Sequence, residues 1–144
     1  MGDASRNEEL VRVFWDVCWN QRRIDQLAEV FHDPFILGAI EGPRARLVEI
    51  VKESVAASSD CNIEVRSLHT FGDAVVTRTL ISGTHTGVVF GVPPTGRAYR
   101  VPMLDVFAFR DGKVYHYMHL ADHLAQAAAM DPDLVIAGVK ANFN

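Results

Sequence analysis

The sequence predicts an α+β fold in which a curved antiparallel sheet wraps around N-terminal helices to form a cone-shaped domain. Apolar residues recur at helical spacing through the first 60 residues, and from residue 62 the hydrophobic period changes to two. Gly72-Asp73 and Asp111-Gly112 separate alternating segments, as the turns of antiparallel hairpins do. Helices kept apart from an antiparallel sheet define the α+β class, and a sheet that bends around helices leaves an interior.

Three helices are predicted before residue 62. The first begins at a capping box formed by Ser5 and Glu8, and its apolar residues cover enough of the circumference to predict burial on two sides. A second, short helix is expected to end at Asp33-Pro34, because the residue before a proline disfavours the helical conformation. The third begins near Pro43, a favourable first helical residue, and ends near 58–60.

Four strands and a short helix follow. The strands are expected over 62–71, from 74 to about 86, over 98–110 and over 113–122, and the Ala-rich segment 123–130 reads as a helix. A loop rich in glycine and proline, residues 87–97, joins the second and third strands.

The length of 144 residues predicts one domain, 1–144, with a core over about 7–130 and a C-terminal tail over 131–144. The tail is apolar at Leu134-Val135-Ile136, and a strand, a lid and a dimer contact all remain open for it.

Composition narrows the class of partner and the compartment. The net charge is −4 and the basic residues do not cluster, so we expect no nucleic-acid partner. No apolar run approaches the roughly 20 residues that span a bilayer, and the polar N-terminus does not resemble a signal peptide. Cys18 and Cys61 lie far apart, so we expect reduced thiols in a cytoplasmic protein without a membrane contact.

The second predicted hairpin places ionisable groups on an apolar face. With Asp111-Gly112 as a two-residue turn, Asp105 pairs with Met118 and Val101 pairs with Asp122, and cross-strand partners project to the same side. The expected inner face consists of Val101, Met103, Asp105, Phe107, Phe109, Val114, His116, Met118, Leu120 and Asp122. Burying a carboxylate there is costly unless it is paired or protonated, and proton transfer is one reason to do so.

The first predicted hairpin adds two further candidates. A turn at Gly72-Asp73 pairs Ser67 with Arg78 and His69 with Val76, which brings Arg78 and His69 toward the same interior. Both assignments depend on register, because a shift of one residue turns every side chain to the other face.

Three consecutive segments carry a family resemblance. They read Gly-Thr-His-x-Gly at 83–87, Pro-Pro-Thr-Gly-Arg at 93–97 and Asp-x-Phe-x-Phe-Arg-Asp-Gly-Lys at 105–113, with a final Asp122. In this order they resemble the SnoaL-like polyketide cyclases, over roughly residues 7 to 130. The resemblance implies the nuclear-transport-factor-2-like fold, a homodimer, and a cyclase that uses no metal or organic cofactor on a polyketide-type small molecule.

The resemblance also implies which residues act. In that family the acid/base is the Asp in a Trp-x-x-x-Asp arrangement after the last long strand, which here is Asp122, with Met118 in place of the Trp. An intramolecular aldol closure removes a proton between two carbonyls and returns one to oxygen, and a single carboxyl group can do both. The candidate catalytic residues are Asp122, Asp105 and His116. The candidate substrate-binding residues are Arg78, His69, Trp15, Trp19, Met118, Met103, Phe107 and Leu120.

Several structural alternatives stay open. Asp122 could cap the helix at 123–130, and Asp105 could be a structural acid paired with His116 or Arg78. Trp15 and Trp19 could belong to the core alone.

Other functions and sites also stay open. His85 would need a bulge to reach the interior, and no metal site is expected, because residues 116 and 119 of a strand point to opposite faces. Ring closure could instead be a shape-directed pericyclic reaction, and the cone could be a non-catalytic binder of a small apolar molecule or of a partner subunit.

Overall fold

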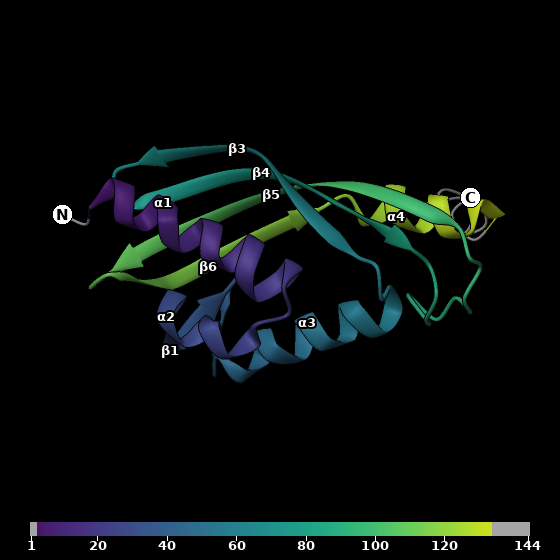
Figure 1. The fold of residues 1–144 in the computed structure, drawn as a ribbon, viewed down its shortest axis with the longest axis horizontal. Helices are drawn as coiled ribbons and strands as arrows, with labels where there is room; N and C mark the ends of the chain where they lie inside the picture. The colour runs from purple at the N-terminus through teal and green to yellow at the C-terminus, as the bar shows by residue number, and fades with distance from the viewer. Residues whose placement is uncertain (1–2, 134–144) are drawn as a thin grey trace.

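The computed structural model describes residues 3–133 of the chain (Figure 1). Its elements are α1 (Ala4–Arg12), the π-helix η1 (Val13–Asn20), η2 (Ile24–Gln26), α2 (Leu27–Val30), β1 (Phe31–Leu37), β2 (Ile40–Gly42), α3 (Ala45–Ala57), β3 (Asn62–Phe71), β4 (Ala74–Thr84), β5 (Ala98–Arg110), β6 (Lys113–Ala121) and α4 (His123–Met130). The apolar tail residues 134–136, for which the sequence left three alternatives open, lie outside the described residues.

The six strands form one curved, open sheet in the order β2-β1-β6-β5-β4-β3. Helices α1 and α3 lie on one side of it, and α4 lies at the end of the sheet remote from the N-terminus (Figure 1). The α+β fold with helices against a curved sheet is therefore confirmed. One pairing differs from the prediction, because β1 runs parallel to β6 whereas every other pair is antiparallel.

The β1–β2 hairpin was missed in the sequence. The second helix ends at Val30 rather than at Asp33, and the chain then enters β1. Pro34 lies inside this strand, within the stretch between Phe31 and Ile36 where the register against β6 shifts. A proline is tolerated there because an irregular stretch does not require its missing N–H.

The start of α1 also differs from the prediction. Asp3 is the N-cap, and its carboxylate accepts from the Ser5 backbone N–H at 3.0 Å. Glu8 serves no capping box; its carboxylate accepts from the Thr70 hydroxyl of β3 at 2.6 Å.

A bulge in β6 changes which residues face the interior. The predicted pairs Arg110–Lys113 and Phe109–Val114 are present, but Ala108 pairs with His116, so Tyr115 is an extra residue on β6. A bulge of this kind reverses the faces of the strand beyond it. The predicted inner positions of His116, Met118 and Leu120 are therefore wrong, and Tyr117, His119 and Ala121 take their place.

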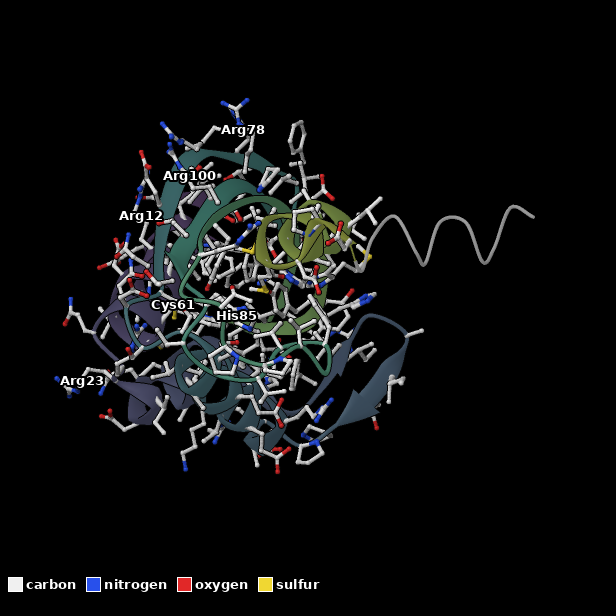
Figure 2. The ribbon with its side chains drawn as sticks, turned by 90° about the vertical axis from the view of Figure 1, so that its right-hand side faces the viewer. Arg12, Arg23, Cys61, Arg78, His85 and Arg100 are labelled. Carbon is white, nitrogen blue, oxygen red and sulfur yellow. The ribbon has the colours of Figure 1, made fainter. Side chains whose placement is uncertain are left out.

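A second bulge acts in the first hairpin. The predicted pairs of Ser67 with Arg78 and of His69 with Val76 are confirmed, but Arg66 is an extra residue between two pairings. The buried row of β4 runs through Val75, Thr77 and Thr79, and not through Arg78. Arg78 and His69 are exposed, and Figure 2 shows Arg78 pointing away from the protein. The prediction that both reach the interior is wrong.

An aromatic cluster joins the helices to the concave face of the sheet. Phe14 contacts Trp15, Phe31, Phe107 and Tyr117 at ring-centroid distances of 4.5 to 5.6 Å. Phe107 of β5 stacks on Tyr117 of β6 at 4.7 Å with an interplanar angle of 10°. Packing of this kind adds about 0.5–1.5 kcal/mol per pair beyond area burial, and it joins the middle of β5 and β6 to η1.

Two further features concern the cysteines and the lengths of the helices. Cys18 and Cys61 are free and buried, and burial raises the pKa of the Cys18 thiol to about 12. Within residues 3–133, none of the helices has the length and apolar character that crossing a bilayer requires.

Candidate active site

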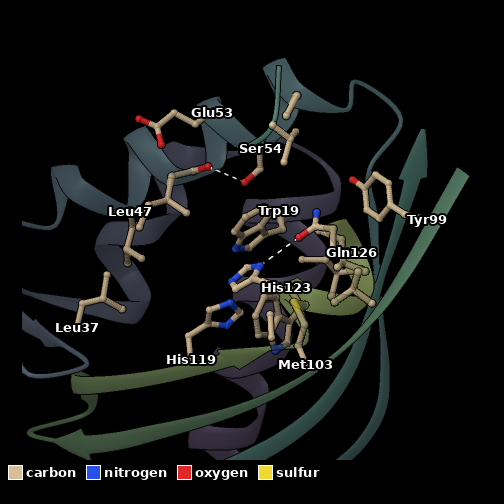
Figure 3. A pocket seen from close by; sticks show the side chains of 18 of the residues that line it. Trp19, Leu37, Leu47, Glu53, Ser54, Tyr99, Met103, His119, His123 and Gln126 are labelled. Atoms are coloured by element: carbon tan, nitrogen blue, oxygen red, sulfur yellow. Dashed lines mark hydrogen bonds between the residues drawn. The ribbon is translucent and has the colours of Figure 1, made fainter. Parts of the chain in front are cut away.

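A cavity of about 570 Å³ lies between the concave face of the sheet and the helices η1 and α3 (Figure 3). This volume falls in the range of small-molecule sites, roughly 300–1,000 Å³. Its walls are mostly apolar, with a few polar groups from α3, β5, β6 and the first half of α4. The residues that line it include Trp15, Trp19, Leu37, Glu53, Phe90, Met103, Tyr117, His119, His123 and Gln126.

Asp105, in the middle of β5, is fully buried beside this cavity. Its Oδ1 accepts from the Tyr117 hydroxyl at 2.9 Å and lies 2.6 Å from His119 Nδ1. Its Oδ2 accepts from the Thr79 hydroxyl at 3.4 Å. The β6 bulge creates this arrangement, because it places His119 directly opposite Asp105. A buried carboxylate with three donors is a satisfied group, and its geometry is fixed by its partners.

His119 connects this buried acid to the cavity. Its side chain is 33% exposed and lines the cavity, while its Nδ1 faces Asp105. Nε2 is therefore the ring nitrogen left to meet a ligand. An imidazole held by a carboxylate at Nδ1 can accept a proton at Nε2, because the carboxylate stabilises the imidazolium that forms.

Tyr117 completes the group as a neutral donor. Burial, followed by the charge of Asp105 and the hydrogen bond to it, raises the pKa of Tyr117 well above its usual range. The phenol therefore keeps its proton at neutral pH and orients Asp105.

Asp122 lies at the N-cap of α4 and its side chain is exposed. Its Oδ1 accepts from the Ala125 backbone N–H at 2.9 Å. Asp122 is not among the residues that line the cavity. The capping alternative matches this geometry, and the sequence-based expectation that Asp122 projects into the interior is wrong.

The other candidate residues differ in whether they lie at the cavity. Trp15, Trp19 and Met103 line the cavity, and Phe107 is fully buried in the aromatic cluster behind it. Both indole Nε1–H groups are buried without a protein partner in the described part of the chain. Five predicted residues lie away from the cavity on the outer side of the sheet: His69, Arg78, His116, Met118 and Leu120.

The predicted partners of Asp105 were also wrong. His116 Nε2 donates to the Gly38 carbonyl at 2.8 Å, and Asp105 pairs with His119 instead of His116 or Arg78. His119 was expected on the face opposite to His116 and so outside the interior, because the sequence offered no reason to place an extra residue at Tyr115. The signal that could have found it is aromatic, since moving the register by one sets Tyr117 opposite Phe107.

Two further expectations concerned the position of His85 and a metal site. His85 is fully buried, and its Nδ1 lies 3.0 Å from the Thr95 hydroxyl, where it holds the 87–97 loop. Across residues 3–133, no three metal-binding side chains come together.

Comparisons with known proteins agree with this architecture. A model of the SnoaL-like polyketide cyclase family matches residues 9–130. The aklanonic acid methyl ester cyclase AcmA of Streptomyces galilaeus is 22% identical over 111 residues, covering 73% of this chain and 77% of that protein. The aklanonic acid methyl ester cyclase DnrD of Streptomyces peucetius is 26% identical over 113 residues, covering 74% of this chain and 78% of that protein.

The structure of TsrD from Streptomyces laurentii superposes with a TM-score of 0.83 at 21% identity, covering 91% of this chain and 98% of that one. At this identity the likeness concerns the fold. The family match extends over most of the chain and includes both the cavity walls and the Asp105–His119 pair. The chain belongs to the SnoaL-like polyketide cyclase family.

Proposed function

We propose that this protein closes a ring in a polyketide-type small molecule by acid/base catalysis at the Asp105–His119 pair. The observation that carries the proposal is a fully buried carboxylate that holds an imidazole at the wall of a 570 Å³ apolar cavity. Membership of a cyclase family and relatives named as aklanonic acid methyl ester cyclases support the same reaction class.

In the proposed reaction, His119 Nε2 takes a proton from a carbon between two carbonyls. The resulting enolate carbon attacks an acceptor carbonyl within the same molecule, and the acceptor oxygen gains a proton. Asp105 stabilises the imidazolium between these steps. Product and substrate are isomers and nothing is oxidised or reduced, so the proposal includes no cofactor.

The cavity favours a neutral, largely apolar substrate. Aromatic and aliphatic side chains form most of its wall, and among residues 3–133 the one acidic group that lines it is Glu53, with no lysine or arginine. The unpartnered Nε1–H groups of Trp15 and Trp19 are buried donors for substrate oxygens. A substrate of several fused or folded rings would be held in a reactive conformation by such walls, which itself accelerates closure.

Aklanonic acid methyl ester, the substrate named for the relatives, is a suitable first test molecule. We expect the purified protein to convert it to a product of identical mass and different retention time, and we expect His119→Gln to lose most of this activity. Full activity in His119→Gln would favour a closure directed by shape alone. Recovery of an unchanged, bound molecule from the wild type would favour the non-catalytic binding cone and contradict the proposal.

We also propose that the protein is a homodimer that buries the outer face of its sheet. Leu104 pairs with Leu120 and Val106 pairs with Met118, which forms an apolar patch on that face. Leu104 is 48% exposed and Leu120 is 69% exposed, and an exposed patch of this kind is typical of a contact between proteins. Sedimentation should show a dimer for the wild type and a monomer for Leu120→Glu; a monomeric wild type at micromolar concentration would contradict the proposal.

A further inference from the structure

A second imidazole lines the same cavity beside His119. His123 is the first residue of α4, and its ring centroid lies 6.4 Å from that of His119 (Figure 3). The two side chains come from different elements, since His119 lies near the end of β6 and His123 lies beyond the strand. The chain therefore presents two proton-exchanging groups to one mostly apolar space.

The two imidazoles have different partners. His119 Nδ1 faces the Asp105 carboxylate at 2.6 Å, whereas His123 Nδ1 lies 3.1 Å from the amide oxygen of Gln126 one turn later in α4. An amide oxygen only accepts, so His123 Nδ1 carries a proton. Its Nε2 is the nitrogen left for a ligand, as in His119.

Two side chains contact the His123 ring, and the helix that carries it is capped. Asp122 caps the first turn of α4 through the Ala125 N–H, Gln126 holds Nδ1, and Phe90 packs edge-on against the ring at 5.6 Å. Phe90 and Gln126 line the cavity as well. His123 is an exposed residue, and its contacts with Gln126 and Phe90 set its ring at the cavity wall.

We propose that His123 is a second catalytic residue, which binds the acceptor oxygen of the substrate while His119 takes the proton from carbon. This inference rests on the proposed function. In the reaction, the C–H bond breaks toward His119 Nε2 and its electron pair forms the new C–C bond through the enolate. The π pair of the acceptor carbonyl moves to its oxygen, which takes a proton from Nε2 of the His123 imidazolium. The pair is reset by moving one proton from His119 to His123 through solvent.

Asp122 gains an indirect role from this assignment. It is a positioning residue, because its carboxylate fixes the turn that presents His123 and does not reach the cavity lining. An aspartate at this place in the sequence thus matters to the site through the helix that it caps.

Binding of 4-nitrophenolate tests the inference without knowledge of the natural substrate, because its delocalised oxyanion imitates the oxygen of an enolate or of a developing alkoxide. We expect His123→Gln to bind it about tenfold more weakly than the wild type, equivalent to about 1.4 kcal/mol. His69→Gln is the matched control, since His69 is exposed on the outer side of the sheet, and its affinity should be unchanged.

Side-chain nitrogen NMR gives the second readout. We expect saturation with 4-nitrophenolate to shift the Nε2 resonance of His123, and to leave that of His116 in place because His116 Nε2 is bound to the Gly38 carbonyl. Equal affinity of wild type and His123→Gln, an unmoved His123 resonance, or no binding by the wild type would overturn the inference.

The failures of the two proposals are distinguishable. If 4-nitrophenolate binds at His123 but the protein turns over no polyketide ester, the cyclase proposal is wrong and the oxygen-binding role of His123 stands. If His123→Gln turns over the substrate with unchanged kcat and KM, the role of His123 is wrong and the cyclase proposal stands.

Discussion

Asp105 and Asp122 are two aspartates only 17 residues apart, and the fold gives them opposite surroundings. Asp105 is fully buried in β5 and held by Tyr117, His119 and Thr79. Asp122 is exposed at the start of α4 and bonded to a backbone N–H. The partners of a carboxylate, more than its place in a family motif, therefore decide whether it can take part in proton transfer.

The largest expected effect concerns the imidazole that Asp105 orients. His119→Gln keeps a hydrogen-bonding side chain beside Asp105 but removes the group that exchanges a proton, so kcat should fall by about 10²- to 10⁴-fold. The measurement is steady-state turnover of a polyketide ester by both proteins. His69→Gln provides the control and should retain wild-type rates. A His119→Gln protein with more than half of the wild-type kcat would remove Asp105 and His119 from the mechanism.

The second effect is a pH dependence of stability that Tyr117 contributes beside Asp105. Because the pKa of Tyr117 is raised in the folded protein, its stabilising contribution is complete below the unfolded value of about 10 and is lost as the pH rises above it. The free energy of unfolding of the wild type should fall there by up to about 1.4 kcal/mol per pH unit more steeply than that of Tyr117→Phe.

Urea unfolding between pH 9 and pH 11 checks this slope. The pKa of Tyr99 is also raised by burial, so its contribution remains in both proteins and cancels in the comparison. Parallel slopes would mean that Tyr117 ionises in the folded state and does not act as a fixed donor.

The smallest effect belongs to Asp122. Replacing an N-cap aspartate by alanine costs about 1 kcal/mol, whereas asparagine caps nearly as well. Asp122→Ala should therefore lower the free energy of unfolding by about this amount, and Asp122→Asn should change it by a few tenths of a kcal/mol. Chemical denaturation of both variants gives the comparison. Equal losses in the two variants would indicate that the charge of Asp122, and not its capping bond, stabilises the chain.

Much of the fold followed from local patterns. Strand β5 and helix α4 begin and end where the sequence placed them, and both Gly-containing turns form as expected. Hydrophobic period and turn chemistry are short-range signals, so a single sequence is enough to read them. The pairing of β1 with β6 could not be read in this way, because it joins segments about 80 residues apart.

The site was harder to predict because two extra residues, Arg66 and Tyr115, reverse the faces of their strands. Asp105 and Met103 lie on β5, which carries no extra residue, and both were assigned correctly to the inner face. His116, Met118 and Leu120 lie on β6 beyond its bulge and were assigned to the wrong face. A bulge depends on twist and packing across strands, which alternation within one strand does not report.

The most direct test of the account compares the same substitution at the two aspartates. Asp105→Asn and Asp122→Asn each remove one charge with little change in size, and both can be assayed with one polyketide ester under one set of conditions. We expect Asp105→Asn to lose about 10²- to 10⁴-fold in kcat, because the imidazolium of His119 is no longer stabilised, and Asp122→Asn to stay close to the wild type. A fully active Asp105→Asn beside an inactive Asp122→Asn would contradict it.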